Sequence, residues 1–207
     1  QDSKFIRLDK GVVVDFTMNE ACAAGTGSFL EEQAEKLGIS IKGEFADLAL
    51  ASKNPARLGE RCTVFMERDV TSLLLKGAEV GDLAAGLAYS VALNYLNRVV
   101  RGRKIGKVVF FQGGTAYNDA VAAAFSQILG QEVIVPPHNG VIGAIGMALI
   151  ARDRMAHSGK PSKFRGYDLD KVDFTTREFV CQACSNFCDI KEFKIEGNKS
   201  YWGDKCS

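Results

Sequence analysis

The sequence predicts an α/β fold that is followed by a small cysteine-rich module. Between Lys107 and Arg152 the patterns run strand, helix, strand, helix, which implies an α/β layer with right-handed crossovers. Four of the six cysteines lie between Cys181 and Cys206. Hydrophobic residues make up 46% of the 207 residues, which is enough to bury a core.

The first elements are a hairpin and a helix. Residues 4–8 and 12–16 alternate in polarity around the turn Asp9–Lys10–Gly11, a pattern typical of a β-hairpin. A loop of small residues follows, and from Ser28 the apolar residues recur with helical spacing until Gly38.

The middle of the chain is helical. Helices are expected over residues 45–51, over residues 64–76, and from a cap at Asp82 to about Arg101–Gly102. Asn54–Pro55 separates the first of these helices from the second.

The α/β layer begins at residues 107–112, whose apolar run predicts a buried parallel strand. A helix over 116–129, a strand over 132–135 and a helix over 139–152 complete the layer. We expect a first domain at residues 1–155, a polar linker at 156–173 and a cysteine-rich module at 174–207. This module has too few apolar residues to fold without help.

Composition excludes several classes of function. The net charge is +1, so nucleic-acid binding and attachment to an anionic membrane surface are not expected. No apolar run reaches the ~18 residues of a membrane span. The cysteine spacing favours metal binding over disulfides in a chain of cytoplasmic character.

The loop Asn19–Gly27 is the first candidate site, and it leads directly into a helix. Gly25 and Gly27 allow the backbone to approach a ligand closely, and the helix start offers free N–H groups. This arrangement suits a phosphate, and it suits a metal–thiolate cluster at Cys22 equally well. The alternative is an ordinary helix start made of small residues.

Cys62 also stands just before a helix, where the helix dipole favours a thiolate. The alternative is a buried, inert cysteine. Cys22 and Cys62 make half of the four thiolates that a cubane iron–sulfur cluster needs, and a twofold dimer would supply the other half.

A third candidate is Gly113–Gly114, which follows the predicted strand and precedes Asn118. Ligands of open α/β sheets bind outside the carboxyl ends of the strands, where this pair would let a flat ring lie against the backbone. A tight strand-to-helix turn without a ligand is the alternative. His138 could line the nucleotide side, although such a histidine is more often a solvated loop residue, and His157 is expected in the linker.

The fourth candidate is the cysteine set of the tail, Cys181, Cys184, Cys188 and Cys206. Four thiolates suit tetrahedral zinc or an iron–sulfur cluster. Ile190, Phe193 and the pair Tyr201–Trp202 are expected to form a hairpin over this site. The alternative is a frayed tail with reduced cysteines.

Four segments together resemble the activator ATPases of 2-hydroxyacyl-CoA dehydratases and of benzoyl-CoA reductase. They are residues 19–31, 62–70, 111–118 and 139–150, within a resemblance that covers about residues 1–152. The resemblance implies an actin/Hsp70/sugar-kinase-like, ribonuclease H-like lobe. It implies a homodimer that binds ATP with Mg and one 4Fe-4S cluster, held by Cys22 and Cys62 of each subunit. The nucleotide-binding residues it implies are Asp2, Gly25, Thr26, Gly27, Gly113, Gly114 and Asn118.

The expected function is ATP-dependent delivery of a low-potential electron to an acyl-CoA dehydratase or reductase, with ferredoxin or flavodoxin as the donor, in an anaerobic cytoplasm. The chain starts at what resembles the end of the family's second phosphate loop, so it is expected to be the second lobe of a larger protein and inactive alone. Glu20, Ser28 and Met66 depart from the family's pattern. Two alternatives remain: a cluster-free, sugar-kinase-like ATP-binding lobe, and a structural module of a large protein with a zinc-clipped tail.

Overall fold

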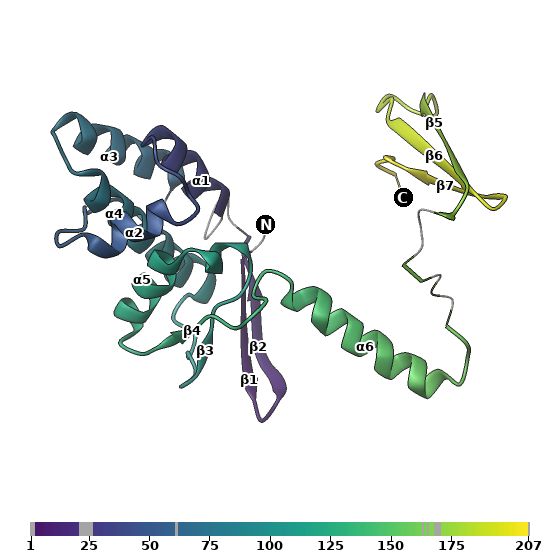
Figure 1. Cartoon of the computed structure of the whole chain (residues 1–207), viewed down its shortest axis with the longest axis horizontal. Coiled ribbons are helices and arrows are strands. Elements are labelled where there is room, and N and C mark those ends of the chain that lie inside the picture. The colour runs from purple at the N-terminus through teal and green to yellow at the C-terminus, as the bar shows by residue number, and fades with distance from the viewer. Residues whose placement is uncertain are drawn as a thin grey trace. The chain divides into compact units, whose positions relative to one another are not determined.

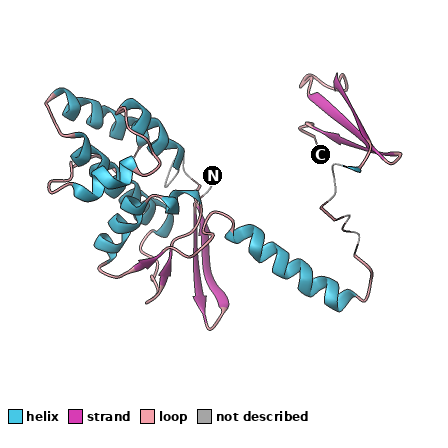
Figure 2. Cartoon of the chain, in the orientation of Figure 1, coloured by secondary structure: helices cyan, strands magenta, loops and turns pink. Residues whose placement is uncertain are grey.

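The computed structural model describes residues 3–20, 27–60, 62–162, 164, 166–167 and 171–206. The chain divides into two compact units, residues 1–150 and residues 151–207. The division falls within the last helix before the tail, α6 (Ile142–Ser158). Figure 2 shows that the first unit contains both helices and strands.

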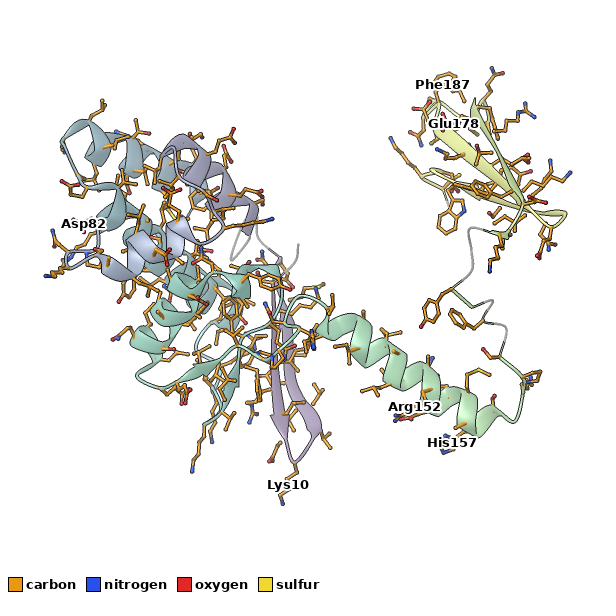
Figure 3. The ribbon with its side chains drawn as sticks, viewed as in Figure 1. Lys10, Asp82, Arg152, His157, Glu178 and Phe187 are labelled. Carbon is orange, nitrogen blue, oxygen red and sulfur yellow. The ribbon has the colours of Figure 1, made fainter. Side chains whose placement is uncertain are left out.

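The predicted hairpin is confirmed as strands β1 (Lys4–Asp9) and β2 (Val12–Met18), which pair antiparallel. Lys10 and Gly11 form the turn with φ values of 49° and 80°. Such left-handed pairs match the twist of the strands they join. Lys10 lies at the tip of the hairpin (Figure 3).

Helices form the core of the first unit. They are α1 (Gly27–Lys36), α2 (Glu44–Ala51), α3 (Thr63–Leu75), α4 (Val80–Tyr95) with a π-helical end η1 (Leu96–Val100), and α5 (Asp119–Leu129). The most buried of their large side chains include Leu30, Phe45, Leu83, Leu87 and Val121. Figure 1 shows α1 to α4 gathered together and the β1–β2 hairpin extending away from them.

The predicted helix cap at Asp82 is wrong. Helix α4 begins at Val80 with Glu79 as its N-cap residue, and Asp82 lies in the first turn. The Asp82 carboxylate accepts a hydrogen bond of 2.6 Å from the Ser52 hydroxyl, so it ties α4 to the end of α2. A tertiary contact therefore occupies the side chain that would otherwise cap the helix.

The parallel strands are present but short. Strand β3 (Val109–Phe110) pairs parallel with β4 (Val133–Ile134), and within the described residues these two strands form a sheet separate from β1–β2. The expectation that β3 is buried is wrong, since Phe110 is 57% exposed. No third strand adjoins this pair in the described part of the chain, so β3 and β4 each keep one edge without a strand partner.

After β3 the chain forms a 3₁₀ turn, η2 (Gly114–Tyr117), and then α5, so the single helix predicted over residues 116–129 is divided at Asn118. Helix α6 starts three residues later than the predicted residue 139 and continues to Ser158. His157, expected in a linker, therefore lies in the last turn of α6. In the described residues, no helix is both long and apolar enough to cross a membrane.

The tail contains an antiparallel three-stranded sheet in the order β5 (Phe174–Val180), β6 (Asp189–Ile195), β7 (Asn198–Trp202). The predicted hairpin corresponds to β6 and β7, which turn at Glu196–Gly197. Strand β5 is an additional partner that the sequence pattern did not indicate.

Candidate functional site

Two of the predicted site segments meet in the first unit. Gly27 begins α1 and closes the Cys22 loop, and Thr115 lies in η2 directly after the glycine pair. A Cβ atom placed on Gly27 would lie 3.3 Å from Thr115 Oγ1. The start of α1 and the turn after β3 are therefore in contact, although 88 residues separate them in the sequence.

The glycine pair forms a turn that is held by a second loop. Gly113 has φ 101°, a conformation that favours glycine. Its N–H donates to the Asn139 carbonyl at 2.9 Å, and the Asn139 side-chain amide donates to the Gly113 carbonyl at 3.0 Å. Gly113 follows β3 and Asn139 follows β4, so this pair joins the carboxyl ends of both parallel strands.

Asn118 is the N-cap residue of α5. Its Oδ1 accepts hydrogen bonds from the N–H groups of Ala120 and Val121 at 3.1 and 3.3 Å. The residue is buried, and its Nδ2 amide has no hydrogen-bond partner. A buried amide without a partner is costly, and none of the described residues supplies an acceptor for Asn118 Nδ2.

Tyr117 and Gly140 close one side of the glycine turn. A Cβ atom on Gly140 would lie 2.5 Å from the Tyr117 hydroxyl oxygen, so a larger residue there would require the tyrosine side chain to move. His138, considered for the nucleotide side, is exposed in the loop before Asn139 and has φ 60°.

Cys62 is the N-cap residue of α3 and is half-buried with a free thiol. Its carbonyl accepts from Met66 N–H at 3.0 Å and closes the first turn, while its side chain makes no cap hydrogen bond. The next N–H groups of α3 have no partner within the helix, so the helix start is partially positive. A thiolate metal ligand is well placed there.

Four predicted site residues, Asp2, Cys22, Gly25 and Thr26, lie outside the described residues. Gly27, Gly113, Gly114 and Asn118 are described, and the structure brings Gly27 next to the segment Gly113–Asn118.

The tail cysteines follow the strand ends of the second unit. Cys181 and Cys188 lie opposite each other beyond the last β5–β6 pair, and Cys188 is buried. The charge of Asp204 raises the pKa of the Cys206 thiol, and the charges of Cys184 and Cys188 add to this effect. Among the described residues, no three His, Cys, Asp or Glu side chains are already arranged to hold a metal ion.

Three further side chains of the site, Thr115, Tyr117 and Asn139, are not indicated by the sequence motifs. Thr115 and Tyr117 lie within the glycine motif. Asn139 could have been found by its position, because it follows the second parallel strand just as Gly113 follows the first.

This geometry defines a class of protein. Parallel strands end in a glycine turn beside helix N-termini, which is how α/β proteins bind nucleotides and phosphates. Comparison with known families specifies the class: the profile of the BadF/BadG/BcrA/BcrD ATPase family matches residues 1–151. The chain belongs to this family.

Two relatives of this chain are named as activators of acyl-CoA dehydratases. The chain is 40% identical over 152 residues to the activator of lactoyl-CoA dehydratase from Anaerotignum propionicum, covering 73% of this chain and 58% of the relative. It is 38% identical over 159 residues to the (R)-2-hydroxyglutaryl-CoA dehydratase activating ATPase from Acidaminococcus fermentans, covering 75% and 59%.

Among solved structures, the activator of the 2-hydroxyisocaproyl-CoA dehydratase from Clostridium difficile with bound ADPNP matches with a TM-score of 0.71 and 34% identity. The match covers 80% of this chain and 62% of that structure. The chain therefore spans about three-fifths of the length of the relatives it matches. These findings confirm the resemblance to the activator ATPases.

Proposed function

We propose that this chain is the part of an ATP-dependent activator that links a nucleotide to a dimer-bridging 4Fe-4S cluster. The complete protein would deliver a low-potential electron from ferredoxin or flavodoxin to a 2-hydroxyacyl-CoA dehydratase or acyl-CoA reductase. One observation carries this proposal: Gly27, which ends the Cys22 loop, contacts Thr115 in the turn that would bind the nucleotide.

The nucleotide side consists of the glycine turn and Asn118. Gly113 presents backbone without a Cβ, and the unpartnered Asn118 Nδ2 supplies a directed donor. Asn139 holds the turn in place, so these groups are positioned before a ligand arrives. ATP with Mg is the ligand we expect here, and Asp2, Gly25 and Thr26 would complete its phosphate contacts.

The cluster side consists of Cys62 and, outside the described residues, Cys22. Cys62 fits a cluster ligand because it is a free, half-buried thiol at the positive end of α3. When bound, a 4Fe-4S cluster supplies one-electron redox chemistry at low potential. The chain's own contribution is to hold the thiolate and to direct helix N–H groups toward the negative charge.

The exposed face of α3 supports a homodimer. Val64 and Phe65, directly after Cys62, are 69% and 61% exposed, and Leu75 is 84% exposed at the other end of the helix. A shallow groove runs along this face past Glu67 and Thr71. A second copy covering the apolar residues would bring the two Cys62 residues toward each other, which supplies the missing half of the ligand set.

The coupling between the two sides would pass through α1. Any movement of the turn at Thr115 is transmitted to Gly27, and Gly27 is continuous with the loop that contains Cys22. Nucleotide binding and the cluster environment are thus joined by a few residues.

The test uses the longest form of the protein that contains residues 1–207, reconstituted anaerobically with iron and sulfide. We expect about four irons per two chains, the broad visible absorption of an iron–sulfur cluster, and ATP-dependent electron transfer to an acyl-CoA dehydratase. Cys22→Ser and Cys62→Ser should each lose all three. Cys206→Ser, which removes a thiol outside the family segment, should retain them.

Retention of iron and electron transfer in both Cys22→Ser and Cys62→Ser would contradict the proposal. A colourless protein that binds and hydrolyses ATP would instead support the cluster-free, sugar-kinase-like alternative.

A further inference from the structure

The tail sheet places two cysteines opposite each other. Val180 and Asp189 are the last paired residues of β5 and β6, and the Cys181 N–H continues the register by donating to the Cys188 carbonyl at 2.8 Å. Opposed residues of an antiparallel pair have Cβ atoms about 4.5–5.5 Å apart and lie on the same face. The backbone register therefore places Cys181 and Cys188 as neighbours across the pair.

The segment between them turns back tightly. Phe187 has φ 43° and its N–H donates to the Cys184 carbonyl at 3.4 Å, which brings Cys184 into the turn that connects the two strands. Figure 3 shows Phe187 at this end of the tail sheet.

The chain after β7 returns to the same end. Trp202 pairs with Lys191, and the following Gly203 packs so closely on the Asp189 carbonyl that a Cβ atom there would clash. Gly203 has φ 106°. This contact directs the last residues, including Cys206, toward the strand ends that carry Cys181 and Cys188.

The tail has too small a core to hold this arrangement alone. Among its described residues 171–206, only Cys188 and Ile190 are buried. A sheet with so few buried side chains needs an additional constraint, such as a structural metal. Cys181 and Cys188 lie at an end of this sheet, where a structural metal could supply the constraint.

We propose that Cys181, Cys184, Cys188 and Cys206 bind one structural Zn²⁺ through four thiolates. The metal would draw together side chains that the backbone already brings to one end of the sheet, and each bound thiol would release its proton to solvent. Thiolates around tetrahedral zinc lie about 3.8 Å apart, given a Zn–S distance of about 2.3 Å, which suits an opposed cross-strand pair. Cysteines of a four-iron cluster each bind a different iron, so their sulfurs are spread farther apart. This site lies outside residues 1–151, which match the family, and is independent of the function proposed above.

The experiment measures metal content of the 207-residue chain, purified under reducing conditions without added iron. We expect about one zinc per chain. Cys184→Ser and Cys206→Ser should each lose it, and Cys62→Ser should retain it as the matched control. Replacement of zinc by Co²⁺ should produce the intense visible bands of a tetrahedral tetrathiolate site.

Trp202 provides a second readout, because it is the only tryptophan of the chain and lies in β7. A strong zinc chelator should change its fluorescence, and added zinc should restore the original spectrum. The proposal is overturned by stoichiometric iron and sulfide in the tail, by disulfides that consume the tail thiols, or by zinc that survives both tail substitutions.

Discussion

Gly113 and Asn139 hold each other through two hydrogen bonds, one donated by the backbone of Gly113 and one by the side chain of Asn139. Gly113 lies in the loop after β3 and Asn139 in the loop after β4, so the pair fixes the separation of two loops at one edge of the sheet. The consequence is a glycine turn whose shape depends on a residue 26 positions away.

Asn139→Ala should destabilise the first unit. Asn139 is 7% exposed, so the substitution removes a buried donor and leaves the Gly113 carbonyl without that partner. We expect a loss of about 1–3 kcal/mol in the free energy of unfolding, measured with urea. Asn54→Ala, in an exposed loop, should change it by less than about 0.5 kcal/mol. Equal effects of the two substitutions would show that the pair does not support the turn.

Substitutions of Asn118 separate capping from ligand binding. Asn118→Ser keeps an oxygen that can accept from the α5 N–H groups, whereas Asn118→Ala removes it and should cost about 1 kcal/mol of stability. Neither variant has the unpartnered amide donor, so both should bind ATP more weakly when tested in the longest form of the protein. If Asn118→Ser bound ATP as well as the unaltered protein, the amide would have no role in the site.

Gly86→Ala tests the packing of α4. A Cβ atom on Gly86 would clash with the Ala56 carbonyl, and the Ala56 N–H is itself held by the Asp82 carbonyl at 2.9 Å. Because backbone must move, we expect a loss of about 1–3 kcal/mol in urea unfolding. Gly143→Ala, with no atom near its new Cβ in helix α6, should be neutral or stabilising by up to about 1 kcal/mol. The reverse order would contradict the contact.

Tyr95 makes the stability of the first unit sensitive to alkaline pH. Burial raises its pKa from 10.0 to about 12, and its hydroxyl donates to the Lys4 carbonyl at 2.9 Å. A raised pKa favours the protonated native form, so this contribution is complete below pH 10 and is lost as pH rises toward 12. At pH 11 the loss is about 1 kcal/mol.

Urea unfolding at pH 8 and pH 11 measures this effect. Tyr95→Phe should lack the loss of about 1 kcal/mol, whereas Tyr167→Phe, at a residue that is 94% exposed, should behave like the unaltered chain. Identical pH dependence in all three proteins would refute the assignment to Tyr95.

Phe65→Glu tests the proposed dimer face. A charge at this exposed apolar position should make the protein monomeric in size-exclusion chromatography with light scattering, with its thermal stability unchanged. Val108→Glu, an equally exposed residue next to β3, serves as the control and should leave the dimer intact. Dimers that persist in Phe65→Glu would place the interface elsewhere.

The sequence predicts the local elements well because their signals are local. The hairpin turn at Lys10–Gly11, the helix end at Gly38 and the strand-to-helix turn at Gly113 each follow from a few adjacent residues. The Asp82 cap was wrong because Ser52, thirty residues earlier, binds the same carboxylate. A pattern within one helix cannot reveal a partner outside it.

The candidate site was predictable in its motifs and not in its contacts. Glycine-rich segments around Gly27 and Gly113 are visible in the sequence, but their contact depends on the packing of α1 against the turn. Asn139 was missed for the same reason. The burial expected for β3 was wrong because burial depends on neighbouring strands, and the strand's own apolar run carries no information about them.

Helix α6 buries none of its seventeen residues. Its backbone amides are therefore protected only by the helix itself, whose opening costs little free energy. Trypsin should cut at Arg152 or Arg154, which are exposed in this helix. One brief digestion would then release the four-cysteine segment from the portion that matches the ATPase family, and each product could be purified for separate biochemical work.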